Sequence, residues 1–468
     1  MKIPQEMHEQ YVKAKEMIEN SKDIKVYSHI DCDGICSGAI LSTILDRQNK
    51  EHEIEFVNLD VLDNIDLDHE LTIFSDLGSG QNIDGKAKEN QKIIVLDHHP
   101  PLRDINYGED KNYSFLEINP MHHGIDGSYY VCGGGLCYFL AKEFEYNDLS
   151  WIGLLSAIGD MQNTKSGHFE GLNEIIQQDA IDGGYLKLTK NDINIYGRNT
   201  RPLFVALSYF SDVKLPITNN TNETMAVLEE LGIDEKHNRK TLNELTMEEK
   251  GKIYNYLTGM ISKVVPGRYV KYIPQLIIGD SYTFLKEDPA SFLRDASEFS
   301  TAMNACGRNH EEKIAMEVLK GDRFVALDEL EAVSLNHRRN LAQAISKVAE
   351  EDETNIIEIE NLQYFDGDGI KPEIVGTITG MILGYCNWKK PIIGFTQTDS
   401  EGLKISLRCS RLLSYDGIHF GNIIRQVAGK VGGTGGGHAM ACGAYIPLEK
   451  KSEFIQLFNE ELNGKLID

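Results

Sequence analysis

Short apolar runs alternate with stretches of helical spacing along the N-terminal part of the chain. The runs have the length of strands, and in the intervening stretches apolar residues recur every three or four positions, as in a helix. The predicted strands are 24–29, 54–59, 71–75 and 92–96, and the predicted helices are 8–19 and 34–45. This alternation is typical of an α/β domain built on a mostly parallel sheet.

The same kind of pattern returns near the C-terminus, after a less regular middle region. Between about 185 and 285 the clearest signals are two polar helices, 219–231 and 246–261. Helical spacing follows at 291–303 and over a long stretch, 324–350, that could connect two domains. The remaining predicted elements are strands 356–359, 391–396 and 403–408 and helices 373–385 and 452–462. They indicate a second, smaller α/β unit.

The composition is that of an ordinary soluble globular protein. The 468 residues are 41% hydrophobic and 25% charged, and a chain of this length is expected to form two or three domains. No apolar run approaches the roughly 20 residues of a membrane helix. Residues 1–21 carry Glu and Lys throughout and lack an apolar signal core. We therefore expect a cytoplasmic protein without a membrane partner.

Charge and cysteine content narrow the classes of function. A net charge of −25 argues against broad, non-specific binding to nucleic acid. It leaves room for a locally basic groove or for phosphate binding through a metal. The eight cysteines form no Cys-x-x-Cys pair, so free buried thiols are expected, with structural zinc as the alternative.

Three of the predicted strands end in residues that commonly bind metals. His29, Asp31 and Asp33 follow the first strand, Asp76 follows the third, and Asp97-His98-His99 follow the fourth. In open α/β sheets the functional site lies outside the carboxyl ends of the strands, so we expect these side chains to meet there. The alternative for each set is an ordinary solvated loop or helix cap.

Carboxylates and imidazoles gathered in this way suit two divalent cations. Such a pair, roughly 3.5–4 Å apart, is a standard device for hydrolysing phosphate esters. The two cations share and acidify a water molecule, and they neutralise charge on the phosphate oxygens. Asp160 ends a predicted apolar helix that starts near 151 and is a further candidate ligand. The sequence therefore predicts a dinuclear metal centre.

The order of these motifs resembles that of the DHH phosphoesterases. His-x-Asp-x-Asp-Gly, a strand-end Asp, Asp-His-His and a later Gly-Asp occur in sequence, and the segment 432–438 resembles the signature of the DHH-associated domain. The resemblance implies two bound cations, Mn²⁺ in the first place and Mg²⁺ as the alternative. It implies that His29, Asp31 and Asp76 bind one ion, that Asp33, Asp76, His98 and Asp160 bind the other, and that the catalytic residues are Asp76, Asp97 and His99.

The resemblance also implies a set of substrate-binding residues. The segment from Asn304 to Arg308 looks like the Asn-Ala-x-Gly-Arg segment of the RecJ branch, in which the Arg contacts phosphate; the alternative is a helix C-cap with a solvated Arg. Nearer the C-terminus, a glycine loop at 432–437 would offer backbone N–H groups to an anion. The implied substrate-binding residues are His99, Asn304, Arg308, Arg408, Arg411, Gly435, Gly436, Gly437 and His438.

The resemblance divides the chain into five segments. A DHH catalytic domain would comprise 1–200 and return at 286–325, interrupted by an insertion at 201–285. A connecting helix at 326–350 would lead to a DHH-associated, substrate-binding domain at 351–468. The expected fold class is α/β, with a mostly parallel catalytic sheet and a smaller α/β C-terminal domain.

The insertion resembles that of the archaeal RecJ-like proteins, including the GINS-associated nuclease. This implies an exonuclease that hydrolyses single-stranded DNA or RNA to mononucleotides in DNA replication or repair. The implied partners are single-stranded nucleic acid and, through 201–285, the GINS complex. Two alternatives stay open: a short-oligonucleotide or cyclic-dinucleotide phosphodiesterase, and a non-enzymatic replisome scaffold. The complete set of metal ligands favours an enzyme, while the direction of digestion and the choice between DNA and RNA stay open.

Overall fold

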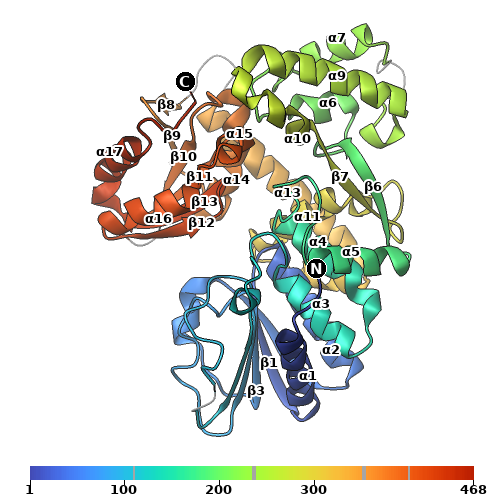
Figure 1. The fold of residues 1–468 in the computed structure, drawn as a ribbon, viewed down its shortest axis with the longest axis vertical. Helices are drawn as coiled ribbons and strands as arrows, with labels where there is room; N and C mark the ends of the chain where they lie inside the picture. The colour runs from blue at the N-terminus through green and yellow to red at the C-terminus, as the bar shows by residue number, and fades with distance from the viewer. Residues whose placement is uncertain (109–110, 234–238, 350–354, 399–400, 468) are drawn as a thin grey trace. The chain divides into compact units, whose positions relative to one another are not determined.

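Five parallel strands form one sheet in the computed structural model of the chain (Figure 1). They are β1 (Asp23–His29), β2 (Glu51–Val57), β3 (Leu71–Ser75), β4 (Lys92–Leu96) and β5 (Ser114–Ile118). The predicted parallel sheet is confirmed. The sequence pattern does not predict β5, because Glu117 interrupts its apolar run. The Glu117 carboxylate is buried and lies 3.2 Å from the Arg103 guanidinium.

The order of the strands is β2-β1-β3-β4-β5. The chain runs from β1 to β2 on one side and returns to β3 on the other, so the strand order reverses between β1 and β3. Open α/β sheets bind their ligands at the carboxyl ends of the strands on either side of such a reversal. Apart from Asp160, which follows a helix, the predicted metal residues end or follow β1, β3 and β4, so this topology places them at that edge.

The two faces of the sheet are buried differently. On one face, side chains such as Ile73 and Ile94 pack under a cluster of helices. On the other face, alternate residues such as Phe74 and Val95 pack under loop residues, including Leu62 and Ile83. The covering helices, with α1 and α2 beside the sheet in Figure 1, are α1 (Gln5–Glu19), α2 (Cys32–Arg47), α3 (Gly133–Glu143) and α4 (Ser150–Gly159). Both faces are buried, which explains the continuous apolar runs of β3 and β4.

The structure describes residues 1–108, 111–233, 239–349, 355–398 and 401–467. They fall into two compact units, Met1–Asp192 with Gly279–Leu335, and Ile193–Ile278 with Asn336–Asp468. The rest of the first unit comprises α5 (Asn173–Asp182), α11 (Ala296–Gly307), α12 (Glu312–Lys320) and most of a two-stranded sheet of β6 (Leu186–Ile193) and β7 (Ile278–Phe284). Among the described residues, no helix combines the length and apolarity that crossing a membrane requires.

The chain passes between the units in β6, in β7 and, for the last time, within one long helix, α13 (Val325–Val348). This helix corresponds to the predicted connecting helix at 326–350. The last residue of that prediction and the first four of the expected C-terminal domain, 350–354, lie outside the described residues. All eight cysteines are free and buried, as expected.

The second unit combines a helical region with a six-stranded mixed sheet in the order β12-β13-β11-β10-β9-β8. The helical region consists of α6 (Leu203–Ser208), α7 (Thr221–Glu230), α9 (Met247–Val264) and α10 (Ile273–Ile277). The strands are β8 (Ile357–Glu358), β9 (Gln363–Asp366), β10 (Ile392–Gln397), β11 (Gly402–Arg408), β12 (Thr434–Gly437) and β13 (Ala441–Pro447). The remaining helices are α14 (Pro372–Met381), α15 (Arg411–Tyr415), α16 (Phe420–Lys430) and α17 (Lys451–Glu461).

The helical region shares its hydrophobic core with the C-terminal sheet. Leu257 and Tyr269 belong to the same buried cluster as Ile405. The Tyr269 hydroxyl also donates a hydrogen bond to Asp416 Oδ2 (2.6 Å). The structure therefore differs from the expected division, because residues 193–278 form one unit with the C-terminal domain. Sequence periodicity identifies α7 and α9 but cannot show which core they join.

The predicted glycine loop at 432–437 is wrong for most of its length. Thr434–Gly437 forms β12, an edge strand paired antiparallel with β13. A Cβ on Gly435 would lie 3.3 Å from Ala428 of α16, and a Cβ on Gly421 of α16 would overlap the carbonyl oxygen of Gly437. The glycines thus allow α16 to pack directly on the strand. Glycine is uncommon in strands, so the sequence pattern indicated a loop.

Candidate metal centre

The first strand and the helix after it place three side chains at the carboxyl edge of the sheet. β1 ends at His29, and Asp31 caps the N-terminus of α2 by accepting a hydrogen bond from the Gly34 amide at Oδ1 (3.1 Å). Asp33 lies in the first turn of α2. The change from strand to helix ends the strict alternation of side chains, so all three can reach one site.

Asp76 stands between the ligands that follow β1 and those that follow β4. It has a left-handed backbone (φ 59°), which is uncommon for residues other than Gly, Asn and Asp. Its Oδ2 lies 3.5 Å from His29 Nδ1, and its Oδ1 lies 3.2 Å from His98 Nε2. One carboxylate therefore faces both sets of ligands, as a bridging ligand must.

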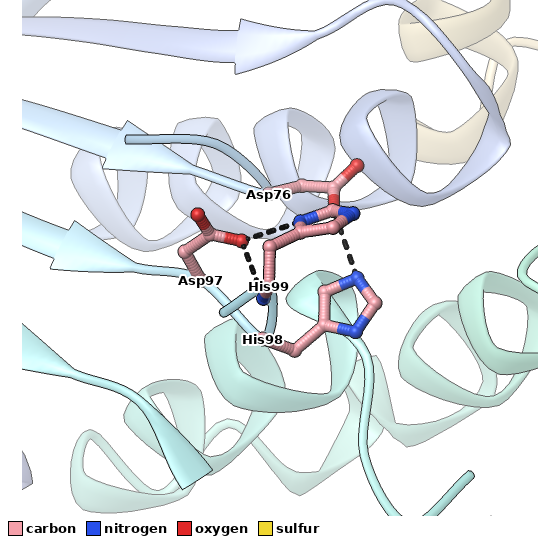
Figure 2. Close-up of side chains that lie close together, drawn as sticks. All are labelled: Asp76, Asp97, His98 and His99. Carbon is pink, nitrogen blue, oxygen red and sulfur yellow. Dashed lines mark hydrogen bonds and ion pairs between the residues drawn. The ribbon is translucent and has the colours of Figure 1, made fainter. Parts of the chain in front are cut away.

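Asp97 holds His99 in place (Figure 2). Asp97 Oδ1 accepts hydrogen bonds from His99 Nδ1 (2.8 Å) and from the His99 amide (3.2 Å), while Oδ2 accepts one from the Ser79 amide (2.8 Å). Asp97 is fully buried, whereas the His99 side chain is 50% exposed. With Nδ1 engaged, Nε2 of the half-exposed His99 ring is available to a ligand.

His98 is oriented by a backbone carbonyl. Its Nδ1 donates a hydrogen bond to the Gly127 carbonyl (2.7 Å). In the neutral ring Nε2 then carries the lone pair, and it lies 3.5 Å from Asp33 Oδ2 and 3.2 Å from Asp76 Oδ1. A carbonyl that fixes the far nitrogen is the usual support of a metal-binding histidine.

These side chains form three overlapping groups of possible ligands. In each group, one ligand atom from every residue lies within 4.8 Å of the others. The groups are His29, Asp31 and Asp76; Asp33, His98 and Asp160; and Asp76, Asp97, His98 and His99. The structure thus brings together all the predicted metal ligands, with Asp76 and His98 each in two groups.

The donor set fits divalent cations. Three of its buried atoms form no hydrogen bond among the described residues: His29 Nδ1, Asp76 Oδ1 and His98 Nε2. Leaving a buried polar atom without a hydrogen bond is costly, so atoms of this kind indicate a missing partner. Since they converge from three strand ends and lie beside several carboxylates, the missing partner is cationic. Oxygen and imidazole donors together suit Mn²⁺ or Mg²⁺.

The electrostatics of the site also favour a bound cation. Burial disfavours protonated His98, yet the carboxylates of Asp160, Asp76 and Asp33 outweigh it and hold the His98 pKa well above its ordinary value. Burial, together with the nearby Asp76 carboxylate, raises the pKa of Asp33. Burial is also the main cause that raises the pKa of Asp160 to about 6. The site thus concentrates negative charge that a cation would neutralise.

Sequence reasoning missed the residues that hold Asp33. The amides of Gly133 and Gly134 donate to Asp33 Oδ2 (2.8 Å) and Oδ1 (2.7 Å), and the Ser156 hydroxyl also donates to Oδ1. The N-terminus of α3 therefore binds this carboxylate, as helix N-termini bind anions. The signal was the run of three glycines at 133–135. Glycine is a poor helix former, so such a run indicates a close approach.

Asn304 and Arg308 lie beside the first group of ligands. Asn304 Oδ1 accepts a hydrogen bond from the Cys32 amide (3.0 Å), next to Asp31. Gly307 packs so tightly that a Cβ would overlap the Ile30 carbonyl oxygen. The half-buried Arg308 ends α11. Burial lowers the Arg308 pKa and the Asp31 carboxylate opposes this, so a positive charge faces the site. Asn304 therefore supports the ligand loop.

The candidates of the C-terminal sheet differ in their surroundings. The Arg411 guanidinium donates to both oxygens of Asp212 and to the Leu276 carbonyl (2.7 Å), so its donors serve the packing of 193–278. Arg408 ends β11 beside α14, where its Nη2 would lie 3.1 Å from a Cβ on Gly376. The His438 amide donates to the Ala441 carbonyl in the turn between β12 and β13 (2.9 Å). All three candidates belong to the second unit, whereas the metal ligands belong to the first.

Three family models match the chain. They are the DHH family, N-terminal domain (residues 23–158), the DHH-CID domain (195–276) and the DHHA1 domain (356–464). An uncharacterised protein of Methanocaldococcus jannaschii is 31% identical over 451 residues, which cover 95% of this chain and 94% of that protein.

Two solved structures share the fold. CDC45 from Entamoeba histolytica has a TM-score of 0.61 and 15% sequence identity, and the match covers 98% of this chain and 99% of that chain. RecJ from Thermus thermophilus in complex with Mn²⁺ has a TM-score of 0.56 and 14% identity, covering 98% of this chain and 55% of that chain. This chain therefore spans about half the length of that RecJ.

Proposed function

This chain is a RecJ-like member of the DHH superfamily, as its motifs predicted, and from that premise we propose that it is a two-metal-dependent exonuclease. It removes mononucleotides from the end of single-stranded DNA or RNA, in DNA replication or repair. The observation that carries the proposal is the convergence of the candidate ligands at one site, where buried atoms of His29, Asp76 and His98 form no hydrogen bond among the described residues.

Each residue of the site has a distinct task in this reaction. Bound Mn²⁺ or Mg²⁺ ions supply an acidified water and neutralise charge on the phosphate. The N-terminus of α3 holds Asp33, and the Gly127 carbonyl holds His98, so the ligands are positioned before the ions arrive. Asp97 orients the half-exposed His99 ring, which can donate a hydrogen bond to a phosphate oxygen. Arg308 adds a planar pair of donors for the same phosphate.

A direct test of the proposal is digestion of end-labelled single strands. We expect Mn²⁺-dependent release of mononucleotides from long strands of DNA, RNA or both, and little attack on duplexes. Product sizing distinguishes the alternatives. A faster rate on dinucleotides than on long strands would instead indicate a short-oligonucleotide phosphodiesterase. No hydrolysis of any of these substrates with Mn²⁺ or Mg²⁺ would favour a scaffold.

Replacing Arg308 should weaken substrate binding more than chemistry. Arg308→Ala is expected to raise KM for a single strand by about tenfold to a hundredfold, because a bidentate contact to phosphate is lost. Arg308→Lys should raise KM less than Arg308→Ala, since an ammonium group keeps the charge but is a point charge that cannot make the bidentate contact. Arg47→Ala is the matched control, because Arg47 lies at the far end of α2 and pairs with Asp148. An unchanged KM in Arg308→Ala would contradict the assignment.

The proposal includes a partner, the GINS complex, bound by the helical region 193–278. The DHH-CID match to 195–276 and the likeness to CDC45 support it. Met225 of α7 and Met247 of α9 are 37% and 79% exposed and offer apolar contacts. Met225→Glu and Met247→Glu should reduce co-elution with GINS and leave the nuclease rate unchanged. If both variants bind GINS as tightly as the wild type does, this docking surface is wrong. Deletion of the region is unsuitable, because its core is shared with the C-terminal sheet.

A further inference from the structure

Tyr445 is an exposed aromatic residue on the second strand from the edge of the C-terminal sheet. It lies on β13, and its side chain is 53% exposed. Its neighbours Ala444 and Ile446 point to the other face and are buried. A tyrosine with so much exposed ring area contributes little to a core, so its position calls for another explanation.

Strand register places a row of side chains across this face. Tyr445 pairs with Lys404 of β11 on one side and with Thr434 of β12 on the other. Residues directly opposite one another in an antiparallel pair share a face. Two residues further along, the next row contains Gly436 and Gly443, which have no side chains, and Ser406, which is buried beside Gly376 of α14. The row after that contains Ala441 and Arg408.

Positive charge lines the same surface. Lys404 Nζ lies 5.6 Å from the centre of the Tyr445 ring, as in a cation–π pair. Arg425 of α16 is exposed, and its Nη2 would lie 3.1 Å from a Cβ on Gly436. Within the described part of the chain, neither Lys404 nor Arg425 forms an ion pair with an acidic side chain. In a protein with a net charge of −25, two such cations beside an exposed ring are a local exception.

We propose that this face of the C-terminal sheet binds a single strand of nucleic acid, with a base stacked on Tyr445 and phosphates on Lys404 and Arg425. The inference rests on the proposed function and adds a residue that determines substrate length. An aromatic ring beside cations is the arrangement that single-strand binding uses, because every base has a face that can stack. Because Gly436 and Gly443 have no side chains, the sugar-phosphate chain can approach the protein backbone there.

The distance along β11 sets the length of strand that can use this contact. Lys404 and Arg408 are four residues apart, which is about 13 Å at 3.3 Å per residue. This is roughly the rise of four stacked nucleotides. A dinucleotide bound at Arg408, to which the family resemblance assigns a substrate contact, would therefore not reach Tyr445, whereas a longer strand would. Tyr445 should accordingly favour long strands over dinucleotides.

The test compares variants in the full-length protein. Binding of fluorescein-labelled oligothymidylate is measured by anisotropy in an Asp76→Asn background, which prevents digestion. Adding Tyr445→Ala should weaken binding by about tenfold, and Tyr445→Phe should keep it, because the ring is retained. Lys404→Gln should reduce the salt dependence of binding, measured as the slope of log K against log salt concentration, by about one, because one phosphate contact is lost. In the active protein, Tyr445→Ala should lower the ratio of kcat/KM for long strands to that for dinucleotides by about tenfold.

Two results would overturn the inference, and they can be told apart. If Tyr445→Ala binds oligothymidylate as tightly as its parent, the stacking contact does not exist, although the proposed nuclease stands. If the Asp76→Asn protein itself fails to bind oligothymidylate and the wild type digests no strand, the proposed function fails as well. Tyr209→Ala is the matched control, because Tyr209 is 43% exposed in the same unit and lies outside this face.

Discussion

Replacing Asp76 with asparagine should lower the Mn²⁺-dependent nuclease rate by about a thousandfold. The Asp76 carboxylate faces His29 and His98 from one position, so in the proposed two-metal enzyme its loss would remove a ligand from both ion sites. Several kcal/mol of transition-state stabilisation by the ions correspond to a rate factor of this size. Asparagine suits the test, because it tolerates the left-handed backbone of Asp76 and changes only the charge and one donor.

The stability of this variant provides a second readout. Saturating Mn²⁺ should raise the melting temperature of the wild type, since an ion that binds only the folded state adds about 2.7 kcal/mol at a hundredfold excess over Kd. In Asp76→Asn this shift should largely disappear, while the protein with EDTA should be at least as stable as the wild type because one buried charge is gone. Asp68→Asn is the control, since Asp68 precedes β3 at its opposite end and is exposed. Full Mn²⁺-dependent activity in Asp76→Asn would disprove the bridging role.

Replacing Gly134 with alanine should lower both the stability of the protein and its nuclease rate, because it disturbs the support of Asp33. A Cβ on Gly134 would lie 2.6 Å from Ser156 Cβ of α4 and 3.3 Å from Asp33 Oδ1 of α2, so helix α3 would have to move away from both. Overpacking of this kind costs about 1–3 kcal/mol of stability. The same movement pulls two amide donors from Asp33, and a ligand displaced by about 1 Å can cost about a hundredfold in rate.

The control for this prediction is a glycine-to-alanine change at a position where the added Cβ would make no close contact. Gly259 lies in helix α9, and a Cβ there would meet no atom within 4 Å. Gly259→Ala should leave the nuclease rate unchanged and add up to about 1 kcal/mol of stability, because alanine favours the helix. Thermal melting and single-strand digestion measure both effects. If Gly134→Ala digests as fast as the wild type, then α3 does not position Asp33.

The ligands of the site could be predicted from the sequence because they are coded locally. Each set follows a short apolar strand, and open parallel sheets bring such strand ends to one edge. That rule alone is enough to gather His29, Asp76 and His98 at one site. The parallel order of the sheet follows from the same alternation of strands and helical stretches.

The supports of the site could not be predicted in the same way. Gly134 and Ser156 lie far along the chain from Asp33, and nothing in their own segments says which carboxylate they bind. Arg411 shows a further limit, because the sequence pattern placed it at the end of a strand, whereas it begins helix α15. Its donors bind Asp212 and the Leu276 carbonyl of a region that precedes it by more than a hundred residues.

By itself, the sequence determined the α/β class, the family and which candidate ligands stand at the strand ends, because apolar periodicity and strand-end residues are local properties of the chain. Only the tertiary structure decided that residues 193–278 share a core with the C-terminal sheet, that the glycine segment is an edge strand under α16, and that Tyr445 and Lys404 form one exposed row. These features depend on contacts between distant segments. Such contacts are chosen by packing and register, which one stretch of sequence does not specify.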